Sequence, residues 1–302
     1  MENQKDDIVM KARSSRACIS AGYRLYTGNF KRIFRYSWVA ALVYAAVCSV
    51  GGTLMVLRPQ LVLLTVGIIL VAEALFASYG FAVLSQHQAS GSIALTGRWF
   101  CIDTHILVRT LKCWLCVAAI LMAAGAVVGA VGYAAMKLLS PYTAMGCVSL
   151  VSLVAICLLL PLTYVAPRYV LCEDAGFWRQ LRRGYPVAMR RWGFIFTVSF
   201  VVAIVQAALV LVTSLPASIL TLANMSSAQS LMMGDTIGMP PHIGWLAAAT
   251  FLLIGFIQAY VQLSALFPTY YMYGAIEANE RERDEFRAKV TNSKPVNPKI
   301  RK

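Results

Sequence analysis

The chain has 302 residues, of which 59% are hydrophobic and only 13% are charged. Because a soluble globular chain has about a quarter of its residues charged, this composition excludes an ordinary soluble domain and favours one membrane domain. The formal net charge of +14 does not indicate a nucleic-acid partner, since no basic stretch is interleaved with aromatic residues in a polar segment.

Residues 1–36 form a basic segment with the pattern of an amphipathic helix. Its apolar residues recur every three or four positions: Ile19, Tyr23, Tyr26, Phe30 and Ile33. Four cations lie mostly off this stripe, and we predict that they bind lipid headgroups: Arg16, Arg24, Lys31 and Arg32. Such a helix lies in the headgroup plane of a membrane, near anionic lipid. Gly28-Asn29 is a candidate interruption, with Asn29 as the cap of the following helix.

Six apolar runs follow, each long enough to cross the hydrocarbon core, which takes about 20 helical residues. They cover about 37–57, 60–84, 111–136, 144–166, 194–222 and 245–273. Short connections at Arg58-Pro59 and Ser140-Pro141 indicate tight hairpins. The sequence therefore predicts an all-α membrane domain over residues 37–276, built of three hairpins at about 37–84, 111–166 and 194–273.

The cations predict how this domain is oriented. Of the 27 Lys and Arg residues, only Arg58 and Lys137 lie in the connections on one side of the predicted membrane domain. Cytoplasmic loops carry the excess of Lys and Arg in membrane proteins. We therefore expect both termini in the cytoplasm.

Glu73 lies near the middle of the second run, about 15–20 Å from either end at 1.5 Å per residue. A carboxylate there is costly, so it is protonated, paired, or facing a polar cavity. Polar residues of other runs are its candidate partners: Tyr164, Gln206, Gln258 and Gln262. Two interpretations remain open: a proton- or cation-coupling carboxyl in a transport path, or a neutral acid that hydrogen-bonds between helices.

The third run opens on Cys113 and Cys116, which match the CxxC spacing. A zinc site requires four ligands, whereas cysteines at i and i+3 of a membrane helix pack on one face. No Gly-rich phosphate loop or HExxH motif occurs in the chain. We therefore predict no metal site, no cofactor and no catalytic residue.

A second amphipathic segment lies between the fourth and fifth runs. Its apolar stripe consists of Phe177, Trp178, Leu181 and Tyr185. Its basic face adds three predicted headgroup-binding cations: Arg179, Arg182 and Arg183. The two amphipathic segments align at one fixed offset, with Gly22-Tyr23 on Gly184-Tyr185. This predicts a repeated unit of interfacial helix plus membrane hairpin, and the alternative is chance similarity among apolar sequences.

Residues 277–302 form a charged tail. Acids and bases alternate at helical spacing, with Glu277 and Arg281 at i,i+4. Such pairs support an exposed helix, so we expect a solvated cytoplasmic helix that continues into a basic end.

The stretch 177–185, with the sequence FWRQLRRGY, leads into a membrane helix, and Pro161 and Pro268 mark helix ends. In these features the chain resembles uncharacterised bacterial six-helix inner-membrane proteins and the membrane domain attached to some glycerophosphodiester phosphodiesterases. The resemblance implies a location in the bacterial cytoplasmic membrane. It also implies that no active site lies in this chain, because those enzymes carry their catalytic residues in a separate soluble domain.

For function, we expect a protein that is not an enzyme. The main hypothesis is a scaffold or partner subunit that engages anionic lipid headgroups, other membrane proteins or further copies of itself. The alternative is a small transporter or permease-like protein that uses Glu73.

Overall fold

A computed structural model describes residues 10–93, 104–138, 140–172, 176–234 and 242–293. These residues are almost entirely helical, and no strand occurs among them. The elements are α1 (Ser15–Leu57), η2 (Pro59–Leu61), α2 (Val62–Ser90), α3 (Thr104–Leu138), α4 (Pro141–Leu159), α5 (Leu162–Leu171), α6 (Phe177–Arg190), α7 (Trp192–Met232) and α8 (Ile243–Ser293). The all-α prediction is confirmed for the described part of the chain.

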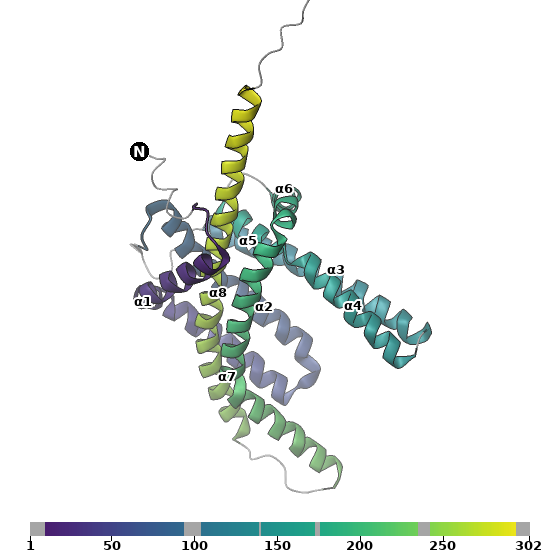
Figure 1. Cartoon of the computed structure of the whole chain (residues 1–302). Helices are drawn as coiled ribbons and strands as arrows, with labels where there is room; N and C mark the ends of the chain where they lie inside the picture. The colour runs from purple at the N-terminus through teal and green to yellow at the C-terminus, as the bar shows by residue number, and fades with distance from the viewer. Residues whose placement is uncertain (1–9, 94–103, 139, 173–175, 235–241, 294–302) are drawn as a thin grey trace, which may run out of the picture.

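Among the described residues, six helical stretches are long and apolar enough to cross a membrane: Ser15–Val56, Val62–Ser90, Thr104–Leu138, Pro141–Leu171, Trp192–Ser227 and Ile243–Val290. Each contains one of the six apolar runs, so the predicted number of candidate membrane helices is confirmed. Several helices continue beyond the apolar run. The 51 residues of α8 extend over about 76 Å at 1.5 Å per residue, more than the hydrocarbon core of about 30 Å. Its last turns accordingly project from the molecule (Figure 1).

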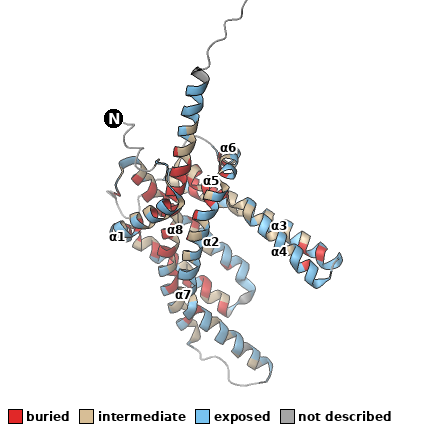
Figure 2. Cartoon of the chain, in the orientation of Figure 1, coloured by how far each residue is buried: buried red, intermediate tan, exposed pale blue. Residues whose placement is uncertain are grey.

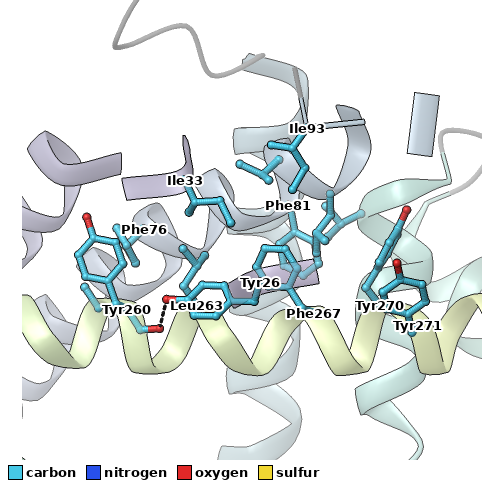
Figure 3. Close-up of a cluster of buried hydrophobic side chains, with 14 of the residues drawn as sticks. Tyr26, Ile33, Phe76, Phe81, Ile93, Tyr260, Leu263, Phe267, Tyr270 and Tyr271 are labelled. Atoms are coloured by element: carbon cyan, nitrogen blue, oxygen red, sulfur yellow. Dashed lines mark hydrogen bonds between the residues drawn. The ribbon is translucent and has the colours of Figure 1, made fainter. Parts of the chain in front are cut away.

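The long helices α1 and α8 pack antiparallel and form the centre of the fold. Near one end of the pair, the Tyr26 hydroxyl donates to the Tyr260 carbonyl at 3.0 Å (Figure 3). Near the other end, Ser49 Oγ donates to the Ala248 carbonyl at 2.6 Å. Aromatic side chains fill the space between them, and the ring centroids of Tyr26 and Phe267 lie 5.2 Å apart. This pairing joins the two ends of the chain into one core.

Glycines allow this close approach of α1 and α8. A Cβ added at Gly22 would lie 2.5 Å from the Cα of Pro268, and one at Gly255 would lie 2.9 Å from the Cβ of Cys48. Small residues at helix contacts let backbones come close, and packing then stabilises the pair inside a membrane. Both ends of the α1–α8 contact therefore require glycine, which has no side chain to separate the two backbones.

The N-terminal segment is not a separate element, because it continues directly into the first membrane helix. Gly28 and Asn29 are helical, and the Asn29 Nδ2 donates to the Leu25 carbonyl at 3.0 Å. The predicted interruption and Asn29 cap are therefore wrong. Tyr26 and Ile33, on either side of Gly28, are buried in the core. We attribute the unbroken helix to this packing, which offsets the cost of about 1 kcal/mol for glycine within a helix.

The helices α3 and α4 pack on each other and project away from the rest of the molecule (Figure 1). Few of their residues are buried (Figure 2), and many of the exposed residues along them are large and hydrophobic. Leu121, Val127 and Leu150 are each at least half exposed. Hydrocarbon is the natural cover for such a surface, since soluble monomers rarely expose apolar patches larger than a few hundred Å².

Candidate functional site

The helix α6 is seated against α5. Its buried face consists of Phe177, Gln180, Gly184 and Ala188. At Gly184 the two helices are so close that an added Cβ would lie 3.3 Å from Val165 and 3.4 Å from the Arg168 guanidinium. The second amphipathic segment is confirmed to be helical, and it buries one face against the protein.

The rest of α6 divides into two exposed faces. One carries Arg179, Arg183 and Arg190 at i, i+4 and i+11, and all three are exposed. The other carries Trp178 and Arg182, followed by Tyr185, Pro186 and Met189. The apolar stripe of the sequence is thus split, because Phe177 is buried in the protein whereas Trp178 is 63% exposed. Arg182 stands on the aromatic face, apart from the other two predicted headgroup-binding arginines.

A proline break before α5 connects this helix to α4. Pro161 has no N–H, so the carbonyl of Cys157 four residues earlier loses its helical donor. The Trp192 indole N–H donates to that carbonyl at 3.0 Å. The Tyr185 hydroxyl donates to the neighbouring Leu158 carbonyl at 3.0 Å. Carbonyls freed within an apolar region require such partners, and here α6 and the start of α7 supply them.

Two acids of α8, just before its projecting end, bind cations of the neighbouring helices. Glu277 Oε1 lies 3.1 Å from Nε of Arg168 and accepts a hydrogen bond of 2.6 Å from the Tyr164 hydroxyl. Glu280 lies one turn further on, 3.5 Å from Arg190 and 3.9 Å from Arg191. The predicted pairing of Glu277 with Arg281 within the tail is replaced by this contact with α5. These ion pairs connect α5 and the α6–α7 junction to α8.

The predicted headgroup-binding cations differ from the arginines bound by Glu277 and Glu280, because they have no acidic partner among the described residues. Arg179, Arg182 and Arg183 are exposed, and none of them has an acidic partner within the part of the chain that the structure describes. In α1, Arg16, Arg24, Lys31 and Arg32 are exposed as well. Of these, Arg32 donates to the Ile93 carbonyl at 3.4 Å. The chain therefore leaves a set of cations available to a ligand.

Arg109 of α3 is a buried cation that the sequence did not single out. It is 8% exposed, and its Nη2 donates to the carbonyls of Tyr169, at 2.6 Å, and Cys172. Its guanidinium also lies 4.8 Å from the centroid of the Tyr169 ring. A cation at these last carbonyls of α5 is favoured by the helix dipole. The only sequence signal for this role was an arginine close to an apolar run.

Glu73 faces a small cavity of about 70 Å³ between α2, α3 and α8. Gln262 lines the same cavity, together with Trp114 and four apolar residues of α2 and α8. The Gln262 Nε2 donates to the Tyr44 hydroxyl at 3.3 Å, while its Oε1 is buried and has no hydrogen-bond partner among the described residues. The space is large enough for water, which needs about 10–15 Å³ and two to four polar partners.

The other predicted partners of Glu73 have contacts elsewhere. Gln206 donates to the Ser264 hydroxyl at 3.0 Å, and Gln258 donates to the Thr213 hydroxyl at 2.7 Å. Both bonds join α7 to α8. Tyr164 binds Glu277 as described above. The structure thus brings only Gln262 of the four candidates to the cavity of Glu73.

The cysteines at the start of α3 pack as apolar side chains. Cys113 is buried in the core and Cys116 packs against it. Among the residues that the structure describes, no three His, Cys, Asp or Glu side chains lie together as a metal site would require.

Comparison with known proteins finds no protein similar to this chain. No protein-family model, no curated protein and no solved structure matches the chain.

Proposed function

We propose that this chain is a non-enzymatic integral protein of the bacterial cytoplasmic membrane that gathers anionic lipid at its cytoplasmic face. There it serves as a scaffold or partner subunit for other membrane proteins. Its membrane helices form three hairpins with both termini in the cytoplasm, and α6 lies at the level of the lipid headgroups.

The observation that carries this proposal is the contrast between two sets of arginines on neighbouring helices. Arg168, Arg190 and Arg191 are bound by Glu277 and Glu280. Arg179, Arg182 and Arg183 of α6 lack acidic partners among the described residues, and so do Arg16 and Arg24 of α1. The first set fixes the helices in place, and the second attracts anionic headgroups, with about 1 kcal/mol for each cation near a membrane surface.

The distribution of charge along the molecule supports the orientation. The first turns of α1, the helix α6 and the projecting turns of α8 lie toward one end of the molecule, and the last turns of α7 and the first turns of α8 lie at the other (Figure 1). Of the two cations away from the basic end, Lys137 has its ammonium 4.6 Å from the centroid of the Tyr133 ring. An end rich in Lys and Arg is typical of the cytoplasmic side.

The proposal is tested with the full chain in nanodiscs of phosphatidylglycerol and phosphatidylcholine. Electron paramagnetic resonance of spin-labelled lipids gives the preference of the restricted lipid shell for phosphatidylglycerol. We expect a clear preference for the unmodified chain, a reduced one for Arg179→Gln/Arg183→Gln, and a decrease at 1 M salt, where the Debye length is about 3 Å.

The matched control is Lys289→Gln, which removes a cation from the exposed, projecting end of α8. It leaves the lipid preference unchanged, because the charge stands away from the bilayer. An unmodified chain without preference for phosphatidylglycerol, or equal losses for the α6 and α8 variants, would refute the proposal.

A transporter is the second candidate, and the cavity shared by Glu73 and Gln262 favours it. The Glu73 carboxyl and the buried Gln262 amide oxygen, which has no hydrogen-bond partner among the described residues, form a small polar site inside the apolar region. Coupling sites of transporters have this character. Flux of protons or monovalent cations into liposomes that falls in Glu73→Gln, but not in Gln258→Leu, would support this function. The absence of any flux would exclude it.

A further inference from the structure

A cavity of about 420 Å³ lies where α6 meets α3, α4 and α5. Its wall is mainly aliphatic, with Ile120, Leu158, Leu159 and Leu162 on one side. Arg182 and Tyr185 of α6 border it on the other side. The cavity therefore combines an apolar wall with a single charged side chain among its lining residues.

Arg182 differs from the neighbouring arginines in its position on the helix. It lies four residues after Trp178 and three before Tyr185, on the aromatic face of α6, whereas Arg179 and Arg183 lie on the other exposed face. An arginine on an apolar face runs its methylene groups along that surface and holds its charged end at the water boundary. Its guanidinium is thus placed to meet an anion at the edge of the apolar wall.

A second cavity, of about 350 Å³, adjoins the first. Leu159 and Leu162 line both, and the second extends between α2, α3, α5 and α8. Its lining is almost wholly apolar, with Thr110, Thr163 and Thr269 as its hydroxyl-bearing residues. Both volumes lie within the range of about 300–1,000 Å³ that is typical of ligand sites.

The helices around the first cavity are held in place by direct contacts, and the cavity is open to the surface of the protein. The hydrogen bond from Tyr185 to the Leu158 carbonyl joins its two sides, and the close contact at Gly184 fixes the position of α6. Leu158 is 50% exposed and Arg182 is exposed. A long apolar ligand can therefore enter from the surrounding lipid without displacing a helix.

We infer that this cavity holds one anionic phospholipid, with its phosphate at Arg182 and an acyl chain along Leu158 and Leu159. The inference rests on the proposed function, since it requires α6 at the level of the headgroups. Net charge decides the occupant. Any phospholipid phosphate can accept two hydrogen bonds from the planar guanidinium, but in phosphatidylcholine the quaternary ammonium already balances that phosphate. An anionic phospholipid keeps its net negative charge for Arg182. The apolar wall then selects a molecule whose anionic end carries a long hydrocarbon chain.

The test measures lipids that remain bound to the full chain after extensive washing in detergent, by native mass spectrometry. The added lipids are phosphatidylglycerol and phosphatidylcholine with the same chains, and sn-glycerol 3-phosphate serves as the headgroup without a chain. We expect one retained phosphatidylglycerol per chain, little phosphatidylcholine, and no displacement by sn-glycerol 3-phosphate.

Two pairs of variants locate the site. Arg182→Gln weakens phosphatidylglycerol retention about fivefold, the effect of one cation near a headgroup, whereas Lys289→Gln, at the exposed end of α8, leaves retention unchanged. Leu158→Trp occupies the cavity and removes the retained lipid. Leu153→Trp, at a similarly exposed position of the same helix that does not line the cavity, leaves the lipid in place.

Equal effects of Arg182→Gln and Lys289→Gln, or of Leu158→Trp and Leu153→Trp, would overturn the inference. Displacement by sn-glycerol 3-phosphate would also overturn it, since the acyl chain of the lipid would then add nothing to binding. If the unmodified chain retains no lipid but still prefers phosphatidylglycerol in nanodiscs, this site is disproved and the proposed function remains. If both are absent, the proposed function fails as well.

Discussion

Trp192, the first residue of α7, donates its indole N–H to the carbonyl of Cys157 in α4, at a distance of 3.0 Å. This carbonyl has no helical donor, because Pro161 occupies the position that would supply it. The bond therefore compensates for a proline break in one candidate membrane helix with a side chain from another. It joins the start of α7 to α4, next to the bond by which Tyr185 of α6 joins the Leu158 carbonyl at the proposed lipid cavity.

The variant Trp192→Phe tests the importance of this bond. Phenylalanine retains the aromatic stack on Phe196, whose ring centroid lies 5.1 Å away, but lacks the N–H. We expect a loss of about 1 kcal/mol in the free energy of unfolding and a thermal midpoint in detergent lower by about 2 °C. Trp245→Phe is the control, since Trp245 is 82% exposed. Equal midpoints of the two variants would contradict the role given to Trp192.

Alanine at two glycines of α1 is expected to have opposite effects. At Gly22 the new Cβ would lie 2.5 Å from the backbone of Pro268, whereas nothing lies within 4 Å of a Cβ at Gly28. Gly22→Ala therefore lowers the free energy of unfolding by about 1–3 kcal/mol through overpacking. Gly28→Ala raises it by up to about 1 kcal/mol through helix propensity. Thermal unfolding in detergent distinguishes the two, and a shift of the same sign for both would be inconsistent with the packing of α1 on α8.

The contact of α8 with α5 predicts a cost for removing Glu277. Glu277→Gln leaves Arg168 without its ion-pair partner, and both side chains are at most 21% exposed. We expect a loss of about 2 kcal/mol, between the values for surface and fully buried pairs, together with faster proteolysis of α6. The double variant Arg168→Gln/Glu277→Gln recovers part of this loss, because no charge is left unpaired.

The matched control is Glu285→Gln, which removes an exposed acid further along the same helix. A thermal midpoint for Glu277→Gln no lower than that of Glu285→Gln would show that α5 and α8 are not joined through this carboxylate.

The membrane helices could be predicted from the sequence because length and apolarity alone decide whether a segment can span hydrocarbon. The helix at residues 177–190 could also be predicted, because its apolar residues recur at helical spacing. The interruption predicted at Gly28-Asn29 was wrong because the prediction used local helix propensity alone and did not include packing against the partner helix. Tyr26 and Ile33 pack into a core whose other half lies more than 200 residues away in the chain.

The polar contacts were harder to predict, since they depend on which helices become neighbours. Glu277 was paired with Arg281 by spacing, yet the fold brings Arg168 closer. Tyr164, a candidate partner of Glu73, belongs to the same contact with Glu277. Only Gln262 reaches the cavity of Glu73. The separate position of Arg182 follows from the rotation of α6 about its axis, which the buried face at Gly184 determines.

The most direct test of the whole account is the sidedness of α6 relative to the C-terminal end of α7, where Gln229 lies. Arg183→Cys and Gln229→Cys, both at exposed positions, are treated with a membrane-impermeant thiol reagent in intact cells, and labelling is compared with that of the parent chain. The account predicts that Gln229→Cys is labelled in intact cells and Arg183→Cys only after permeabilisation. Labelling of Arg183→Cys in intact cells, or labelling of both from one side, would contradict it.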